Sequence, residues 1–176
     1  MTGTTRAASS SAGTGAGLVL MHTRVAPKGT LLDPAAYDDV VADVLGFLEE
    51  RIALAEAAGL HPEQLLLDPG PDFAKTPAQT VAVLRRLDVL HELGRPLLLP
   101  VSRKDFLGAI TGRPPRERDA ATLAAVAAAA DGGAHVVRVH DVRGTADFLA
   151  VRAVLRGDRV LAPSEGLTPE RYPDRG

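Results

Sequence analysis

The sequence contains no cysteine and no tryptophan, and aromatic residues make up only 3% of its 176 positions. The absence of cysteine excludes both a disulfide framework and thiolate metal sites within this chain. With so few aromatic rings, a folded core must be built from aliphatic side chains, and the hydrophobic content of 45% is sufficient for that. The composition is therefore that of one ordinary folded domain.

The chain also lacks an excess of charge and a long apolar run. A net charge of −2 without a basic stripe argues against nucleic acid as the main partner. No apolar run approaches the roughly 18 residues of a membrane span. Residues 1–15, rich in Ser, Thr, Ala and Gly, lack the apolar segment of a secretory signal. We expect a cytoplasmic protein with a disordered segment over residues 1–15 and no membrane partner.

Four short apolar runs alternate with four longer amphipathic segments. The runs predict strands at residues 18–21, 65–67, 96–101 and 136–139, and the segments predict helices at about 34–58, 76–93, 119–130 and 145–155. Strands and helices that alternate in this way indicate an α/β fold with a parallel sheet. Residues 157–176 show no clear period, and an irregular tail is expected there.

Capping signals place several helix ends. Asp33 is expected to cap the first helix, with Pro34 at its first position. Thr76 and Gln79 form a capping box at the start of the second helix, and Gly94 is expected to stop it.

Four strand–helix units are half of a closed (β/α)8 TIM-type barrel, which typically needs about 250 residues. The same four units are also compatible with a small, open, doubly wound sheet. Hydrophobic periodicity alone does not distinguish a partial barrel from an open sheet.

Polar side chains follow the predicted strands at the same point in each unit. His22 follows the first strand, Asp68 the second and residues 102–104 the third, while Arg138 and His140 lie at the end of the fourth. Because the carboxyl ends of parallel strands gather on one rim, we expect these side chains to share a site.

Each of these residues has a chemical interpretation and a simpler structural one. Asp68 suits the N–H groups of a heterocycle, but Asp-Pro-Gly is also a common turn. Residues 102–104 suit an anion or an electron-rich ring, but they also suit the start of a helix. Arg138 and His140 point to one side of a strand and suit a phosphate, whereas an ion pair between Arg138 and Asp141 is the alternative.

Together, four segments resemble the dihydropteroate synthase family, in its order and at about its spacing. They are Leu-Met-His-Thr-Arg at 20–24, Leu-Asp-Pro-Gly-Pro-Asp-Phe-Ala-Lys-Thr at 67–76, Ser-Arg-Lys-Asp-Phe-Leu-Gly at 102–108 and Arg-Val-His-Asp-Val at 138–142. The resemblance covers roughly residues 16–156 and implies a pterin-binding barrel domain. It further implies an enzyme of folate biosynthesis that condenses p-aminobenzoate with 6-hydroxymethyl-7,8-dihydropterin pyrophosphate.

The resemblance also implies a role for each matching residue. Asp68 and Lys104 would be the catalytic residues, with Asp68 on the pterin ring and Lys104 on its carbonyl side. The remaining substrate contacts would be Met21 and Phe73 with the pterin, Ser102 and Arg103 near p-aminobenzoate, and Arg138 and His140 with pyrophosphate. Catalysis would rest on electrostatic stabilisation of the leaving group, which Mg²⁺ would assist.

Two departures from the family pattern limit this expectation. The matching segments belong to the C-terminal half of the family's barrel, so the usual protein ligand of Mg²⁺ has no counterpart here. Pro100 stands where the family usually has glycine close to the pterin. We therefore expect the 176-residue chain to be inactive alone. The alternatives are a noncatalytic module that binds pterin or pyrophosphate, and a half-barrel that pairs with itself as a homodimer.

Overall fold

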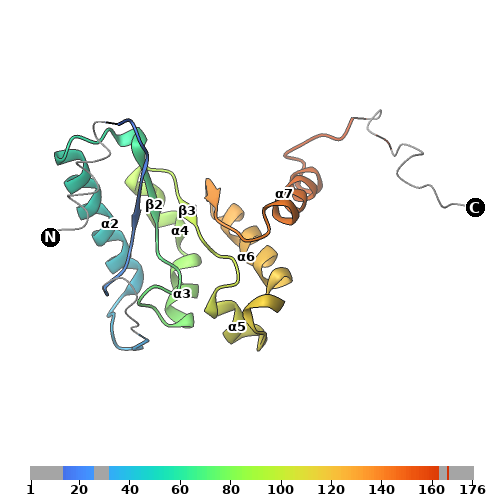
Figure 1. Cartoon of the computed structure of the whole chain (residues 1–176), viewed down its shortest axis with the longest axis horizontal. Helices are drawn as coiled ribbons and strands as arrows, with labels where there is room; N and C mark the ends of the chain where they lie inside the picture. Colours follow the sequence, from blue (N-terminus) through green and yellow to red (C-terminus); the bar gives the residue numbers. More distant parts are fainter. Residues whose placement is uncertain (1–13, 26–31, 163–165, 167–176) are drawn as a thin grey trace, which may run out of the picture. The chain divides into compact units, whose positions relative to one another are not determined.

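The computed structural model describes residues 14–25, 32–162 and 166 (Figure 1). The predictions for residues 1–13 and for most of the tail, 163–165 and 167–176, lie outside the described residues. The chain divides into two compact units, residues 1–141 and residues 142–176. All of the predicted site residues belong to the first unit.

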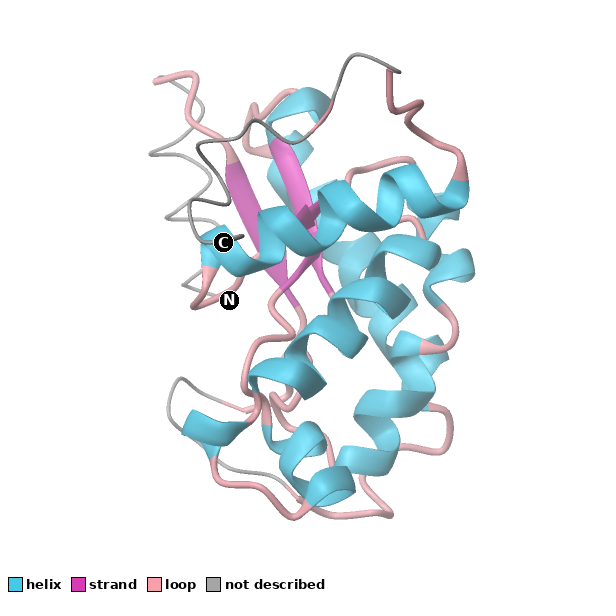
Figure 2. Cartoon of the chain, turned by 90° about the vertical axis from the view of Figure 1, so that its right-hand side faces the viewer, coloured by secondary structure: helices cyan, strands magenta, loops and turns pink. Residues whose placement is uncertain are grey.

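The strands are β1 (Leu18–Met21), β2 (Leu65–Asp68), β3 (Leu98–Leu99) and β4 (Val136–Val137). β1 pairs with β2 and β3 pairs with β4, both in parallel. A parallel bridge between Leu67 and Leu97 connects β2 to the segment that enters β3. In Figure 2 the strands lie beside one another. The prediction of an α/β fold with parallel strands is confirmed.

β3 and β4 are much shorter than the predicted runs 96–101 and 136–139. Pro96 and Pro100 flank β3 and lack the backbone N–H that a ladder needs, so pairing is confined to the residues between them. The N–H of Arg138 still donates to the carbonyl of Leu99 (3.1 Å), but the ladder ends there. Arg138 consequently lies just after β4 and not within it.

α2 (Val40–Ala57) begins six residues later than predicted. Asp39, and not Asp33, is its cap, because the Asp39 carboxylate accepts the N–H groups of Val41 (2.8 Å) and Ala42 (3.1 Å). Asp33 instead closes a turn by accepting the N–H of Ala35 (2.8 Å). The prediction that Asp33 caps this helix was wrong.

The second predicted helix is divided. The capping box of Thr76 and Gln79 opens α3 (Pro77–Leu84) as predicted. The chain then breaks at Arg86 and continues as α4 (Leu87–Leu90) and a 3₁₀ turn, η2 (His91–Leu93). Gly94 ends this segment in the left-handed conformation, with φ of 62°, as predicted.

The remaining elements of the first unit are α5 (Asp105–Thr111), α6 (Asp119–Asp131) and the 3₁₀ turns η1 (Pro62–Gln64) and η3 (Pro115–Glu117). Its core is aliphatic, as the composition predicts; its fully buried side chains include Val44, Leu48, Leu65, Leu67, Leu97, Leu99 and Val101. The second unit contains α7 (Val142–Arg156), which begins three residues before the predicted start.

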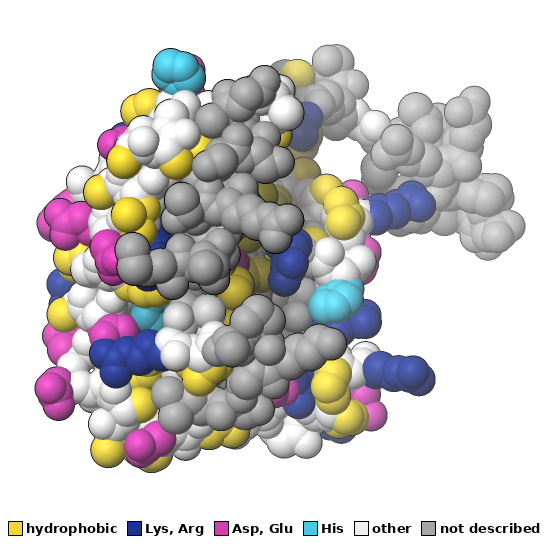
Figure 3. All heavy atoms as spheres, turned by 60° about the vertical axis from the view of Figure 1, so that its left-hand side comes forward, with side chains coloured by type: hydrophobic (Ala, Val, Ile, Leu, Met, Phe, Trp, Pro, Cys, Tyr) yellow, Lys and Arg dark blue, Asp and Glu magenta, His cyan; other side chains and the backbone are white. Residues whose placement is uncertain are grey.

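On the face shown in Figure 3, acidic, basic and apolar side chains of the described residues are interspersed, consistent with the small net charge. None of the helices in the described ranges has the length and apolar character required to cross a membrane.

Candidate active site

The strand ends meet as the sequence predicts. The N–H of His22, just after β1, donates to the carbonyl of Asp68 at the end of β2 (2.9 Å). Farther along, the Ser102 hydroxyl lies 2.8 Å from Nδ1 of His140 and accepts the His140 backbone N–H (3.2 Å). Parallel pairing therefore brings side chains that are 38 residues apart into direct contact.

A cavity of about 520 Å³ lies beside these strand ends and is lined by Pro100, Ser102, Lys104, Arg138, Val139 and His140. Four of the predicted substrate-binding residues are thus in one cavity. Two of them, Lys104 and Arg138, carry positive charge, and such a lining suits an anion. Pro100, the departure from the family pattern, forms part of the cavity wall.

Asp68 is buried, with only 4% of its surface exposed. Its Oδ1 accepts the N–H of Gly70 (2.8 Å), so the residue does close the Asp-Pro-Gly turn. Burial raises the pKa of Asp68 from 3.8 to about 6, against the hydrogen bond from Gly70 and the charges of Lys104, Arg138 and Lys75. Asp68 thus closes a turn and also has a carboxylate with a raised pKa close to cationic side chains.

Lys104 connects the two loops that follow β2 and β3. Its Nζ donates to the carbonyl of Pro71 (3.0 Å) and lies 4.3 Å from the centre of the Phe73 ring. Burial lowers the pKa of Lys104. The predicted contacts Phe73 and Lys104 therefore lie together, although they were assigned from different motifs.

Four predicted residues, Met21, Asp68, Phe73 and Arg103, are not among the residues that line this cavity. The Arg103 guanidinium is paired with the Asp119 carboxylate through contacts of 2.9 and 3.3 Å. Met21, at the end of β1, is opposite Asp68 in the parallel register. Met21 thus lies at the same rim, whereas the Arg103 side chain is directed to α6.

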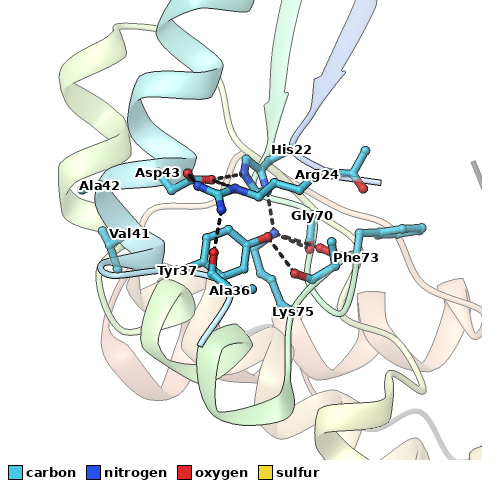
Figure 4. Close-up of polar contacts among 12 residues, drawn as sticks. His22, Arg24, Ala36, Tyr37, Val41, Ala42, Asp43, Gly70, Phe73 and Lys75 are labelled. Atoms are coloured by element: carbon cyan, nitrogen blue, oxygen red, sulfur yellow. Dashed lines mark hydrogen bonds and ion pairs between the residues drawn. The ribbon is translucent and has the colours of Figure 1, made fainter. Parts of the chain in front are cut away.

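Sequence reasoning missed a buried lysine behind the loop that follows β2. Lys75 is 1% exposed, and its Nζ donates to Nδ1 of His22 (2.7 Å) and to the carbonyls of Gly70 (3.0 Å) and Phe73 (3.2 Å) (Figure 4). Burial lowers the pKa of Lys75 from 10.5 to about 8. Three acceptors match the three protons of the ammonium group.

His22 extends this network toward α2. Because an ammonium group only donates, Nδ1 of His22 must accept, and the proton is therefore on Nε2, which lies 2.9 Å from Asp43. Burial and the neighbouring Lys75 lower the pKa of His22 to about 4, which keeps the ring neutral. Arg24 pairs with the same Asp43 carboxylate. Lys75, His22, Asp43 and Arg24 form a continuous relay, named here the lysine–histidine relay (Figure 4).

A weak sequence signal for Lys75 exists. The chain has three lysines among its 20 basic residues, and two of them, Lys75 and Lys104, follow consecutive strands. His22 is 53 residues from Lys75 and 21 residues from Asp43 in the sequence, so only the fold reveals that the three side chains are in contact.

The residues present do not form a site for Mg²⁺. Within the described ranges, no group of three or more His, Asp or Glu side chains is placed to hold a metal ion. The charged side chains that line the cavity are basic, whereas Mg²⁺ prefers oxygen ligands such as carboxylates.

The family model for pterin binding enzymes matches residues 2–140. The chain therefore belongs to the pterin binding enzyme family. Within that family it is similar to dihydropteroate synthases, transferases of folate biosynthesis. It is 41% identical to the enzyme of Escherichia coli over 138 residues, which cover 78% of this chain and 49% of the relative. The Synechocystis enzyme is 42% identical over 139 residues, which cover 78% and 48%.

Solved structures give the same assignment. Dihydropteroate synthase from Stenotrophomonas maltophilia, with imidazole bound in its active site, matches with a TM-score of 0.82 and 44% identity over 89% of this chain and 58% of that one. The enzyme from Xanthomonas albilineans, in complex with 7,8-dihydropteroate, matches with a TM-score of 0.76 and 42% identity over 85% and 54%. The chain spans about half the length of the curated relatives that it matches.

Proposed function

We propose that this chain provides the pyrophosphate side and part of the pterin side of a dihydropteroate synthase site. The reaction condenses p-aminobenzoate with 6-hydroxymethyl-7,8-dihydropterin pyrophosphate, and the fold is the C-terminal half of a (β/α)8 barrel. The supporting observation is the cavity of about 520 Å³ in which Lys104, Arg138 and His140 converge beside Asp68.

The cationic lining carries the proposed chemistry. Arg138 and His140 bind the pyrophosphate oxygens, and Lys104 lies between that group and the pterin. As the C–O bond to pyrophosphate breaks, negative charge grows on the leaving oxygen, and fixed positive charges stabilise it. The aniline nitrogen of p-aminobenzoate then forms the new bond, with Ser102 and Arg103 nearest to that substrate.

Asp68 is proposed to recognise the pterin. Its Oδ1 is held by Gly70, which leaves Oδ2 to accept N–H groups of the heterocycle. With a pKa of about 6, the carboxylate is mostly ionised at neutral pH and accepts such bonds. Phe73, stacked near Lys104, and Met21, opposite Asp68, would provide the apolar walls.

Calorimetry with the dihydropterin pyrophosphate tests this proposal. We expect binding by the 176-residue chain and a loss of about 10- to 100-fold in affinity for Arg138→Ala, which removes a charged hydrogen-bond donor. Arg85→Ala is the matched control. Arg85 lies at the C-terminal end of α3, whereas the loop after β2 leads into the N-terminal end of this helix. No binding, or equal losses in the two variants, contradicts the proposal.

Pro100 favours a second candidate, a noncatalytic pterin- or pyrophosphate-binding module, since a rigid ring occupies the cavity wall. We expect the 176-residue chain to bind ligand without turnover of p-aminobenzoate. Turnover by the purified chain contradicts this candidate. Self-association as a homodimer, participation of Mg²⁺ through the substrate and a cytoplasmic location remain proposals, and light scattering tests the first of them.

A further inference from the structure

Arg118, which has no place in the proposed chemistry, is buried beneath the turn that carries Lys104. It is the residue before α6, and only 8% of it is exposed. A guanidinium is always charged and is rarely buried without several acceptors. Its burial directly behind a candidate catalytic turn calls for an explanation.

Three of the four acceptors that the Arg118 side chain has among the described residues lie on that turn. Its Nη1 donates to the carbonyls of Arg103 (2.9 Å) and Lys104 (2.9 Å) and to the carboxylate of Asp105 (3.1 Å). Its Nε donates to the carbonyl of Arg113 (2.8 Å). One rigid side chain thus holds two consecutive carbonyls of the turn that leads into α5.

The turn requires such support because Arg103 has a φ of 57°, a left-handed conformation that a residue with a side chain rarely adopts. α6 contributes a second contact, since the Thr122 hydroxyl accepts the N–H of Arg103 (3.0 Å). The two carbonyls and this N–H are all held from outside the turn. Lys104 follows directly and is therefore placed by the geometry of Arg103.

Gly108 in α5 provides an independent observation. A Cβ added at this position would overlap the guanidinium of Arg118. The absence of a side chain at Gly108 is thus what allows Arg118 to reach the turn. The close approach of Arg118 to Gly108 explains why a glycine is suited to this position.

We propose that Arg118 is a positioning residue that holds the Arg103–Lys104 turn in its left-handed geometry and thereby sets the place of Lys104 at the cavity. This inference rests on the proposed function for the role of Lys104, but the geometry of the clamp can be tested separately. Arg118 itself lies outside the residues that line the cavity.

Two variants disrupt the clamp while keeping its charge. Arg118→Lys retains the positive charge but loses the planar fork, whose Nη1 reaches the turn while its Nε reaches the carbonyl of Arg113. Gly108→Ala leaves Arg118 in the sequence and displaces its guanidinium. The matched controls are Arg113→Lys, whose side chain is 66% exposed, and Gly46→Ala, a helical glycine of α2 with no atom within 4 Å of an added Cβ.

The measurement is the titration of Lys104 by NMR in protein with ¹³C-labelled lysine, which gives three signals for the three lysines. In both clamp variants we expect the pKa of Lys104 to rise toward the 10.5 of a free lysine, because the side chain leaves its buried place. In both controls it stays unchanged. We also expect pyrophosphate to bind about tenfold more weakly to the clamp variants.

The outcomes separate the two proposals. If thermal stability falls in the clamp variants while the Lys104 titration and pyrophosphate binding stay as in the parent chain, Arg118 is only structural and the inference is overturned. If the titration moves but pyrophosphate binding does not, the positioning role stands and the proposed function of Lys104 fails. A shift in both measurements supports both.

Discussion

The two loops at the rim, residues 70–75 after β2 and residues 102–105 after β3, achieve similar backbone geometries by different means. Both contain residues with side chains at positive φ, namely Asp72 (63°), Ala74 (52°) and Arg103 (57°). The first loop is held by Lys75, which belongs to the loop itself. The second is held by Arg118, which lies directly before α6 and outside the turn.

The difference lies in whether the holding group can lose its charge. In the lysine–histidine relay the pKa of Lys75 is lowered to about 8 and that of His22 to about 4. An arginine stays protonated throughout the accessible pH range. The support of the loop after β2 should therefore respond to pH, whereas the support of the turn after β3 by Arg118 should not.

The largest expected effect is that of Lys75→Met, which keeps the length of the side chain and removes its three donors. The His22 ring and two carbonyls lose their partner inside the protein, and we expect a loss of about 3 kcal/mol in the free energy of unfolding. Lys104→Met, at the other loop, loses one carbonyl contact at a half-buried site and should cost less than about 1 kcal/mol. Urea denaturation of both variants measures the difference. Equal losses in the free energy of unfolding of the two variants would contradict the difference proposed between the two loops.

His22→Gln tests the pH response. The folded-state pKa of His22, about 4, is below its ordinary value of 6.5, so the unfolded chain binds more protons between these values and stability falls as pH drops through them. Between pH 6.5 and 4, the protonation of His22 lowers the free energy of unfolding by at most about 3 kcal/mol. Glutamine retains a hydrogen-bond acceptor and a donor at this position but does not titrate.

The raised pKa of Asp68, about 6, acts in the opposite direction, because the folded protein then binds more protons between pH 3.8 and 6. Asp68 is present in both the parent chain and His22→Gln. Its contribution to the pH dependence of stability therefore cancels when their denaturation curves from pH 7 to 4 are compared. We expect the variant to lose less stability on acidification. Parallel curves would show that His22 is not the titrating group.

The comparison also shows what the sequence could predict. The strand-end positions of Asp68, Ser102 and His140 follow from a repeated strand–helix period, and the capping box at Thr76 from a local pattern. The first rule is visible in the periodicity of the sequence, and the second acts within a few residues. The relay and the Arg118 clamp instead join residues through tertiary packing, for which a single sequence holds no distance information.

The error at α2 has the same origin. Asp33 and Asp39 are both acceptable caps, and Asp33 is followed by a favourable proline. The chain between them forms a turn and a bend instead of a helix, and the Tyr37 hydroxyl there donates to the carbonyl of Ala74 in the loop after β2 (2.7 Å). The structure in which Asp39 caps α2 thus includes a contact between residues 37 positions apart in the sequence.

A smaller effect is expected at the joint between the two loops. Asp72 accepts the N–H of Asp105 (2.6 Å) at the start of α5 and also the Thr80 hydroxyl (3.1 Å). Asp72→Asn tolerates the left-handed backbone but replaces one acceptor oxygen by a donor, for a loss of about 1 kcal/mol. Asp88→Asn, at an exposed carboxylate of α4, is the control. Hydrogen exchange should rise at the first amides of α5 only in Asp72→Asn, and unchanged exchange there would mean that the loops are not joined through Asp72.

The smallest effect separates the side chain of Arg103 from its backbone. Its ion pair with Asp119 lies at the surface, with the two side chains 30% and 58% exposed. Exposed pairs contribute at most about 1 kcal/mol, so Asp119→Asn should change the urea midpoint little and should leave the Lys104 titration unchanged. Because the clamp acts through the Arg103 carbonyl and N–H, it does not depend on the Arg103 guanidinium. A loss of stability as large as that of Lys75→Met would instead make the ion pair, and not Arg118, the main support of the turn.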